Sequence, residues 1–195
     1  MAAAKIEECV EQAILGGCTL VQLREKNASS REFYQRALRV REITARLGVP
    51  LIINDRADIA AAVNAEGLHI GQDDLPYKAA RRIVGHDAVI GLSVSNLGEA
   101  QTAVEMGADY LGITMFETGT KTNTVITGME ELCRIRENVD IPIVVIGGIN
   151  KDTVPLFSGT GINGIAVVSA IVSSNDPAAA ALELKTLFES LARKT

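Results

Sequence analysis

Two kinds of hydrophobic pattern alternate along the chain. Short apolar runs rich in β-branched residues are typical of buried strands, and longer segments with apolar residues every three or four positions are typical of amphipathic helices. The short runs predict seven strands, at 19–24, 51–54, 67–70, 88–92, 110–114, 141–146 and 164–168. The longer segments predict helices between or after them, at 29–47, 56–65, 76–84, 96–106, 128–138, 150–158 and 176–192.

The order of these elements predicts a parallel sheet. Successive strands are separated by segments long enough for a crossover helix, which parallel strands require. We therefore expect the sheet to be covered on both sides, which explains why the run IPIVVI at 141–146 is apolar on both faces. The helix at 29–47 also has marked ends, because Ser29 or Ser30 can cap it with Glu32 in its first turn, and Gly48 can stop it.

The first element is a helix rather than a strand. Residues 2–17 have apolar positions on one helical face and end in two glycines. A βα repeat that opens on a helix has no opening strand, so we expect a (β/α)8 TIM barrel that lacks its first strand at the amino terminus. Such barrels seldom have fewer than about 200 residues, and the single barrel domain expected over 1–195 is slightly shorter. An open, doubly wound sheet would also accept seven parallel strands.

Composition narrows the classes of partner. Asp and Glu outnumber Lys and Arg, 24 to 19, and a formal net charge of −5 argues against nucleic acid. Three cysteines without a C-x-x-C pair argue against a disulfide framework and favour the cytoplasm. No apolar run comes close to the length of about 18 residues that a membrane-spanning helix needs, so we expect neither a membrane partner nor a targeting segment. The unpaired edges of an incomplete barrel are compatible with a homo-oligomer.

Polar residues gather where the predicted strands end. Gln22, Arg24 and Lys26 alternate with apolar residues and therefore point to one side of the first strand. A strand-end ion pair, with Glu25 or with a neighbouring loop, is an equally good interpretation of this pattern.

Carboxylates follow the next two strands. Asn54 and Asp55 end one strand, and Gln72, Asp73 and Asp74 follow the other. Carboxylates at adjacent strand ends suit Mg²⁺, which completes its coordination with water and phosphate oxygens. Alternatively, these aspartates cap the helices that follow.

Later strand ends carry groups that can hold an anion. Ser93 ends a strand, the loop 117–123 contains Thr118, Thr120 and Lys121, and the glycine turn at 146–150 and a helix start at Ser169 offer backbone N–H groups. These two turns follow the seventh and eighth strand positions, where barrels commonly bind phosphate. We expect His69 to pack beside Ile70 rather than to take part in chemistry.

Taken together, several motifs resemble the thiamine phosphate synthase family. They are VQLREK, PLIINDR, GLHIGQDDLP, IGLSVS, GADYLGI, T-G-T-K, IPIVVIGGI and GIAVVSAI, in this order. The resemblance implies a (β/α)8 barrel that joins 4-amino-2-methyl-5-hydroxymethylpyrimidine diphosphate to a thiazole phosphate with Mg²⁺. The products are thiamine phosphate and pyrophosphate.

The resemblance also implies roles for individual residues. It assigns the pyrimidine diphosphate to Gln22, Arg24, Lys26, Asn54 and Lys121, and Mg²⁺ to Asp55 and Asp74. It assigns the thiazole phosphate, or for some hydroxyls the leaving pyrophosphate, to Ser93, Thr118, Thr120, Gly148, Val168 and Ser169. Among these, Lys26, Lys121 and Ser93 are the expected catalytic residues, and no protein nucleophile or general base is required.

Two other functions are also compatible with this sequence. The first is the related thiazole tautomerase, an isomerase of the same fold whose catalytic histidine would fall at Ser95. The second is a non-catalytic barrel that binds a phosphate ligand. The absence of that histidine and the presence of both metal aspartates favour the synthase.

Overall fold

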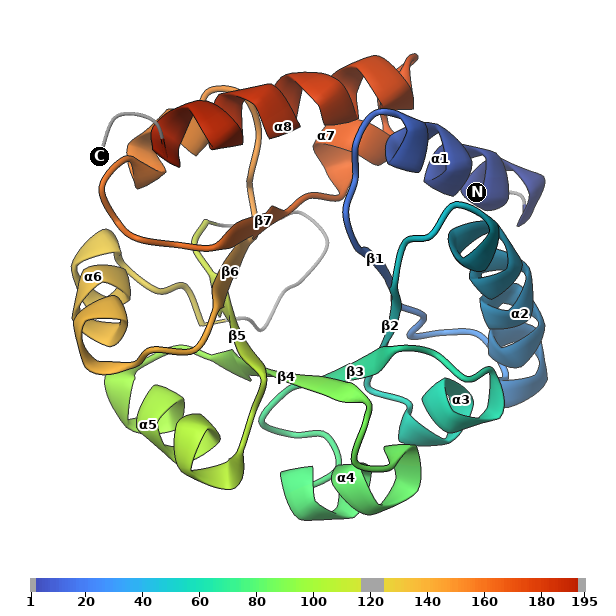
Figure 1. Cartoon of the computed structure of the whole chain (residues 1–195), viewed down its shortest axis with the longest axis horizontal. Coiled ribbons are helices and arrows are strands. Elements are labelled where there is room, and N and C mark those ends of the chain that lie inside the picture. The colour runs from blue at the N-terminus through green and yellow to red at the C-terminus, as the bar shows by residue number, and fades with distance from the viewer. Residues whose placement is uncertain (1–2, 117–124, 193–195) are drawn as a thin grey trace.

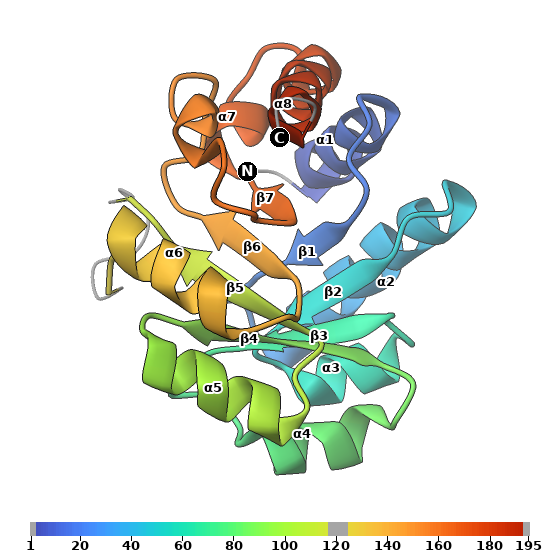
Figure 2. The same ribbon diagram turned by 60° about the vertical axis from the view of Figure 1, so that its left-hand side comes forward.

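The structure is a computed structural model that describes residues 3–116 and 125–192. Its centre is a seven-stranded parallel sheet whose strands lie side by side in sequence order. The strands are β1 (Val21–Leu23), β2 (Leu51–Asn54), β3 (Gly67–Ile70), β4 (Val89–Val94), β5 (Tyr110–Thr114), β6 (Ile143–Ile146) and β7 (Gly164–Ala166). The sheet twists and curls, so its inner face turns in on itself (Figures 1 and 2).

The helices lie outside the curled sheet, as Figure 1 shows. They are α1 (Ala3–Leu15), α2 (Ser30–Arg46), α3 (Ala57–Ala62), α4 (Tyr77–Val84), α5 (Leu97–Met106), α6 (Met129–Asn138), α7 (Ser169–Val172) and α8 (Pro177–Ala192), with a 3₁₀ helix, η1 (Val154–Phe157). The expected cover on both sides of the sheet is therefore of two kinds, helices on the outer face and the sheet's own side chains on the inner face. The inner face needs no helical cover because the strands curl around their own side chains.

Most predicted elements are confirmed, and three strands, β2, β3 and β5, have the predicted bounds. The helix predicted at 150–158 is wrong in type, because this segment forms a turn followed by η1. Asn150 explains the difference: its side-chain oxygen accepts from the backbone N–H groups of Asp152 and Thr153, at 2.9 and 3.2 Å, which favours a turn. The strands β1 and β7 are shorter than predicted.

The layer of helices is closed by α1, which packs between α8 and α2, whereas the described sheet is open between β1 and β7. In the part of the chain that the structure describes, β1 and β7 are the two edges of the sheet and do not pair with each other. By contrast, α1 packs against both α8 and α2. The contact between α1 and α8 requires Gly16, because a Cβ atom there would lie 2.2 Å from the carbonyl oxygen of Ala178.

The core forms between the outer face of the sheet and the helices. Leu51 and Ile53 in β2, Leu111 and Ile113 in β5, and residues of α2 such as Phe33 are fully or almost fully buried. The packing of the helices against the sheet holds the carboxyl ends of the strands at one rim, where the loops to the helices begin.

Among the described helices, none has both the length and the apolar content to cross a membrane.

Candidate functional site

The strand-end residues meet at this rim because all seven strands are parallel. Asn54 pairs with His69 in register, His69 with Gly91, and Gly91 with Tyr110, so four neighbouring strands contribute to one layer. On β1, the alternation predicted from the sequence is present, since Gln22 is exposed and Leu23 is buried. The exposed side chains of β1 therefore belong to the inner face of the curled sheet.

A charged cluster joins the ends of the first three strands. The ammonium of Lys26 forms an ion pair with the carboxylate of Asp55. Asp55 also shares a side-chain hydrogen bond with Asp74, whose Oδ2 accepts from the backbone N–H of Gly71 at 2.7 Å. One cation and two carboxylates thus come together from three separate segments of the chain.

The two carboxyl groups differ in their affinity for a proton. Burial raises the pKa of Asp74, and its hydrogen bond and charge repulsion with Asp55 raise it further. Burial also opposes ionisation of Asp55, but the hydrogen bonds from Asp74 and Lys26 outweigh it and lower the pKa of Asp55. Of the two carboxyl groups, Asp74 therefore holds a proton more tightly, and Asp55 is the one that ionises more readily.

The backbone at Asp55 is in an unusual conformation. Its φ is +66°, in the left-handed region that non-glycine residues rarely adopt. Its N–H donates to the carbonyl of His69 at 2.8 Å, and the N–H of Arg56 donates to the carbonyl of Asn54 at 2.8 Å. Such strain costs on the order of 1–3 kcal/mol and is most common at functional sites, where it aims a side chain.

The aspartates do not serve as helix caps. Arg56 is the amino cap of α3 and Pro76 that of α4, and neither helix end receives a side-chain cap hydrogen bond. Glu25 pairs with Arg36 rather than with its neighbours on β1. The ion-pair interpretation is therefore wrong for Glu25, whereas Lys26 does have a partner in a neighbouring loop, Asp55.

Beside the charged cluster lies a layer of hydrogen-bonded polar side chains, formed by His69, Ser93 and Tyr110. Nε2 of His69 lies 2.9 Å from Oγ of Ser93, and Nδ1 lies 2.9 Å from the hydroxyl of Tyr110. His69 is buried beside its neighbours as expected, with 8% of its surface exposed, but both of its ring nitrogens also have polar side-chain partners, which the sequence did not predict. Sequence reasoning missed Tyr110 altogether. A signal was available in Gly91 and Gly112, two glycines inside strands, which often mark a close approach.

The other predicted residues have simpler surroundings. Gly148 has a φ of +63°, and a Cβ atom there would lie 2.7 Å from Cβ of Phe116. Val168 and Ser169 are exposed at the start of α7, a helix of 4 residues. Asn54 is buried, with 7% of its surface exposed. Gly148 and Ser169 follow β6 and β7, so the predicted phosphate turns do lie at the same rim as the charged cluster.

Several predicted residues lie outside this description or have other partners. Thr118, Thr120 and Lys121 lie outside the described residues. The side chain of Gln72 donates to the backbone carbonyl of Ser93 at 2.7 Å, which ties the loop after β3 to β4. Ser95 donates to Glu99 at the start of α5, so it is part of a helix terminus.

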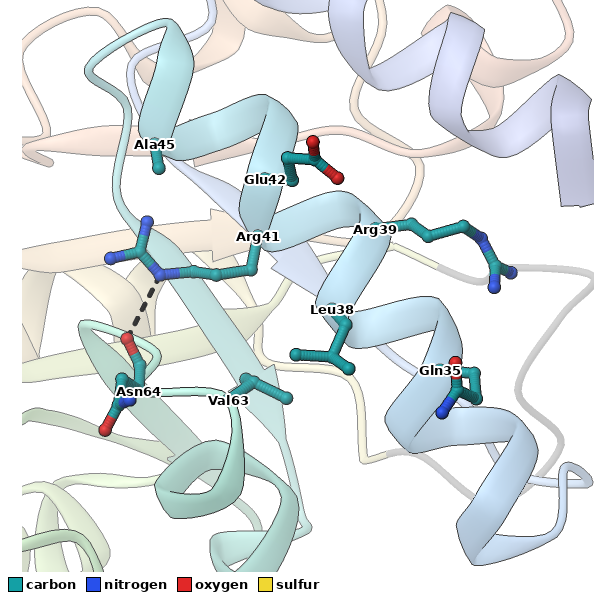
Figure 3. A pocket seen from close by; sticks show the side chains of 8 residues that line it. All are labelled: Gln35, Leu38, Arg39, Arg41, Glu42, Ala45, Val63 and Asn64. Carbon is teal, nitrogen blue, oxygen red and sulfur yellow. Dashed lines mark hydrogen bonds between the residues drawn. The ribbon is translucent and has the colours of Figure 1, made fainter.

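A surface pocket elsewhere does not contribute to the site. Figure 3 shows it on the outer side of α2, next to the end of α3. Arg41 in this pocket donates to the carbonyl of Asn64 at 3.1 Å and pairs with Glu66, and Arg39 pairs with Glu7. Its charges are therefore largely engaged within the helical layer.

The residues present fit one hard divalent cation. Among the described residues, no group of three or more His, Cys, Asp and Glu side chains could hold a metal. Mg²⁺ does not need such a group, because one or two carboxylates suffice when phosphate and water supply the other ligands. The mutual repulsion that raises the pKa of Asp74 is what a cation between the two carboxylates would relieve.

Known proteins resemble this chain over nearly its whole length. The family model described as Thiamine monophosphate synthase matches residues 1–171. The thiamine-phosphate synthase of Clostridium beijerinckii is 55% identical over 189 residues, which cover 96% of this chain and 90% of the relative. That of Chloroflexus aurantiacus is 50% identical over 180 residues, covering 91% and 83%.

Solved structures agree with the sequence relatives. A thiamine phosphate pyrophosphorylase from Pyrococcus furiosus matches with a TM-score of 0.87 and 39% identity, covering 95% of this chain and 90% of that one. A 3-hexulose-6-phosphate synthase, at 17% identity and a TM-score of 0.70, shares the fold alone. With its matching family model, its close relatives and this structural likeness, the chain belongs to the thiamine monophosphate synthase family.

Proposed function

We propose that this chain is a transferase that couples 4-amino-2-methyl-5-hydroxymethylpyrimidine diphosphate to 4-methyl-5-(2-phosphoethyl)thiazole. The products are thiamine phosphate and pyrophosphate, and the reaction belongs to thiamine biosynthesis. The observation that carries the proposal is the cluster of Lys26, Asp55 and Asp74 at the rim of the sheet. An ammonium beside two carboxylates supports a site for a diphosphate and its metal ion, in a chain whose relatives bear the name of this activity.

The proposed reaction is a substitution in which the leaving group departs first. The bond between the pyrimidine methylene carbon and the diphosphate oxygen breaks, and its electron pair leaves with pyrophosphate. The lone pair of the thiazole nitrogen then forms the new carbon–nitrogen bond. The protein's task is to hold charge and to align the two reactants, which are the main contributions to reactions of this type.

The residues divide this task between the two substrates. Gln22, Arg24, Lys26, Asn54 and Lys121 bind the pyrimidine diphosphate, and Lys26 and Lys121 stabilise the negative charge of the departing pyrophosphate. Ser93, Thr118, Thr120, Gly148, Val168 and Ser169 hold the thiazole phosphate or, for some hydroxyls, the leaving pyrophosphate. Both substrates are anions, and positively charged side chains and backbone N–H groups are the groups that bind phosphate oxygens in proteins.

Mg²⁺ is the cofactor we assign to Asp55 and Asp74. When bound, it would neutralise charge on the diphosphate oxygens. When the diphosphate binds, Lys26 would exchange from Asp55 to the diphosphate. Lys26 is suited to such an exchange because 47% of its side-chain surface is exposed, against 17% for Asp55.

The direct test is incubation with both substrates, with and without Mg²⁺, followed by detection of thiamine phosphate. We expect product only when Mg²⁺ is present. Calorimetry with the thiazole phosphate alone separates the alternative, because binding without turnover of the pyrimidine diphosphate would indicate a non-catalytic barrel. The isomerase alternative has less support, since Ser95, where its histidine would fall, is committed to the end of α5.

Further proposals concern the whole chain. The seven strands correspond to the second to eighth of a (β/α)8 barrel, and the position of the first strand lies between β1 and β7. The chain works as one barrel domain over 1–195. We assign it to the cytoplasm because all three cysteines are free, which cell fractionation can test.

A further inference from the structure

The hydroxyl of Tyr110 lies between two parts of the proposed site. It is 2.9 Å from Nδ1 of His69 and also shares a hydrogen bond with the side chain of Gln22. On its other side, the imidazole of His69 reaches Ser93, with 2.9 Å between Nε2 and Oγ. A continuous chain of hydrogen bonds therefore runs from β1 through β5 and β3 to β4.

The strands are built to accommodate the two rings of this chain. A Cβ atom on Gly91 would lie 2.1 Å from Cζ of Tyr110, and one on Gly112 would lie 2.8 Å from Cε1 of His69. The ring centroids of Tyr110 and His69 are 5.5 Å apart. Only glycine at these two strand positions leaves room for both rings, so their arrangement is a specific feature of the inner face.

The direction of the hydrogen bonds follows from the donors available. An amide N–H of Gln22 can donate to the phenolic oxygen of Tyr110, which leaves the phenolic O–H to donate to Nδ1 of His69. A neutral imidazole whose Nδ1 accepts must carry its hydrogen on Nε2, which then donates to Oγ of Ser93. The hydroxyl hydrogen of Ser93 is thereby free to point to the substrate.

Burial favours the hydrogen bond from the phenol of Tyr110 to His69. It raises the pKa of Tyr110, against the smaller opposing effect of the hydrogen bond from Gln22. The phenol therefore keeps its hydrogen at neutral pH and remains a donor to His69.

We propose that Tyr110 is a positioning residue that fixes the Nε2–H tautomer of His69, aligns Gln22, and so orients the hydroxyl of Ser93 as a donor to the substrate. The proposal rests on the proposed function in so far as Gln22 and Ser93 are assigned to the two substrates. Tyr110 itself acts through its neighbours, because its hydroxyl is engaged by Gln22 and His69.

The first test needs neither activity nor a variant. The chain has two histidines, His69 and the exposed His86, so long-range ¹H–¹⁵N spectra of the ¹⁵N-labelled protein resolve both rings. We expect the nitrogen shifts of His69 to show the Nε2–H tautomer, with His86 as internal reference. A Nδ1–H tautomer in the wild-type protein would overturn the proposal.

The second test compares two tyrosine variants. Tyr110→Phe should shift the nitrogen signals of His69 toward a tautomer mixture and lower kcat by about tenfold, as expected when a buried partner loses its hydrogen bond. The KM for the thiazole phosphate should rise as well, because Ser93, whose hydroxyl Tyr110 orients, is among the groups assigned to that substrate. Tyr77→Phe is the matched control, since the hydroxyl of Tyr77 is also hydrogen-bonded, to the carbonyl of Gly107 at 2.5 Å, but contacts none of the site residues.

The outcomes separate this proposal from the proposed function. Unchanged His69 shifts in Tyr110→Phe, or an equal loss of kcat in both variants, would contradict a positioning role. If the wild-type chain makes no thiamine phosphate while the His69 signals respond as expected, the proposed function fails and the arrangement set by Tyr110 stands.

Discussion

At the residue scale, the site depends on a backbone conformation at Asp55 that costs free energy. Asp55 has a φ of +66°, and its carboxylate lies between Lys26 and Asp74. The hydrogen bond from the Asp55 N–H to the His69 carbonyl couples the charged cluster to the layer of polar side chains next to it. A substitution of Asp55 should therefore lower the rate of catalysis more than it lowers stability, because little core packing depends on this side chain.

Replacing Asp74 tests the charged cluster. Asp74→Asn should lower kcat by about 100-fold or more, the usual effect of losing a group that holds charge in the transition state, and change the melting temperature little. Asp73→Asn is the matched control, because Asp73 is an exposed neighbour in the same motif. Wild-type turnover in Asp74→Asn would exclude the proposed metal role of this carboxylate.

Gly112 tests the space left for His69. In Gly112→Ala, the new methyl group would collide with the imidazole, at 2.8 Å from Cε1, so the ring must move away from Ser93. Overpacking of this kind costs about 1–3 kcal/mol, and we expect turnover to fall about tenfold. Gly164→Ala is the control in β7, since its Cβ atom would make only an ordinary contact, 3.5 Å from Val144. Equal activities in the two variants, measured in steady-state assays, would contradict the expected displacement of His69.

At the scale of single elements, α2 shows how local sequence sets a boundary. Ser29 is its amino cap, and a capping box joins Ser29 and Glu32 reciprocally. The predicted stop also holds, because Gly48 follows the end of α2 with a φ of +69°. Since α2 begins after the loop that carries Lys26, its start helps to fix where that loop ends.

The cap makes a measurable contribution to stability. Ser29→Ala should lower the free energy of unfolding by about 1 kcal/mol, because the N–H of Glu32 loses its acceptor. Ser29→Asp, which restores an acceptor, should recover most of the loss. Urea titration of the three proteins measures the difference, and no change in Ser29→Ala would show that the cap is not stabilising.

The same cap predicts a dependence on pH. Hydrogen bonds from the Ser29 side chain and backbone lower the pKa of Glu32 in the folded protein. A lowered pKa stabilises the fold above the ordinary pKa of a glutamate, and this stabilisation is lost as the pH falls through the folded value. The melting temperature of the wild type should therefore exceed that of Glu32→Gln at pH 7 and approach it in acid. A difference that persists in acid would indicate another cause.

At the scale of the whole molecule, the layer of helices is closed although the described sheet that it surrounds is open. The packing of α1 between α8 and α2 brings the first and last helices of the chain side by side. Because β1 and β7 are the edges of the described sheet, each presents backbone groups that another strand could pair with.

Adding a strand tests the proposed barrel. A β-branched segment of about five residues, joined ahead of Met1 by a short turn, should pair with β1 and β7 and raise the melting temperature. The control carries prolines in the added segment, which remove hydrogen-bond donors. If both extended chains melt at the temperature of the original, the edges do not accept a strand. Sedimentation of all three proteins would show whether these edges also associate between copies.

The sequence by itself determined the features that depend on near neighbours. Hydrophobic periodicity predicted the strands and most helices, alternation on β1 placed Gln22 and Leu23 on opposite sides, and the capping residues marked α2. These patterns are readable because the repeat of a strand or helix spans only a few residues. The clustering of polar residues at one rim also followed, since parallel strands end at the same side.

Only the tertiary structure decided which of those residues touch. Lys26 meets Asp55 across 29 positions, and His69 meets Tyr110 across 41. Such contacts depend on strand order, register and the curl of the sheet, none of which a local pattern contains. Local patterns did not predict the left-handed backbone at Asp55 either, because tertiary packing imposes it against local preference. They also did not predict the packing of α1 against α8, because it joins helices from opposite ends of the sequence.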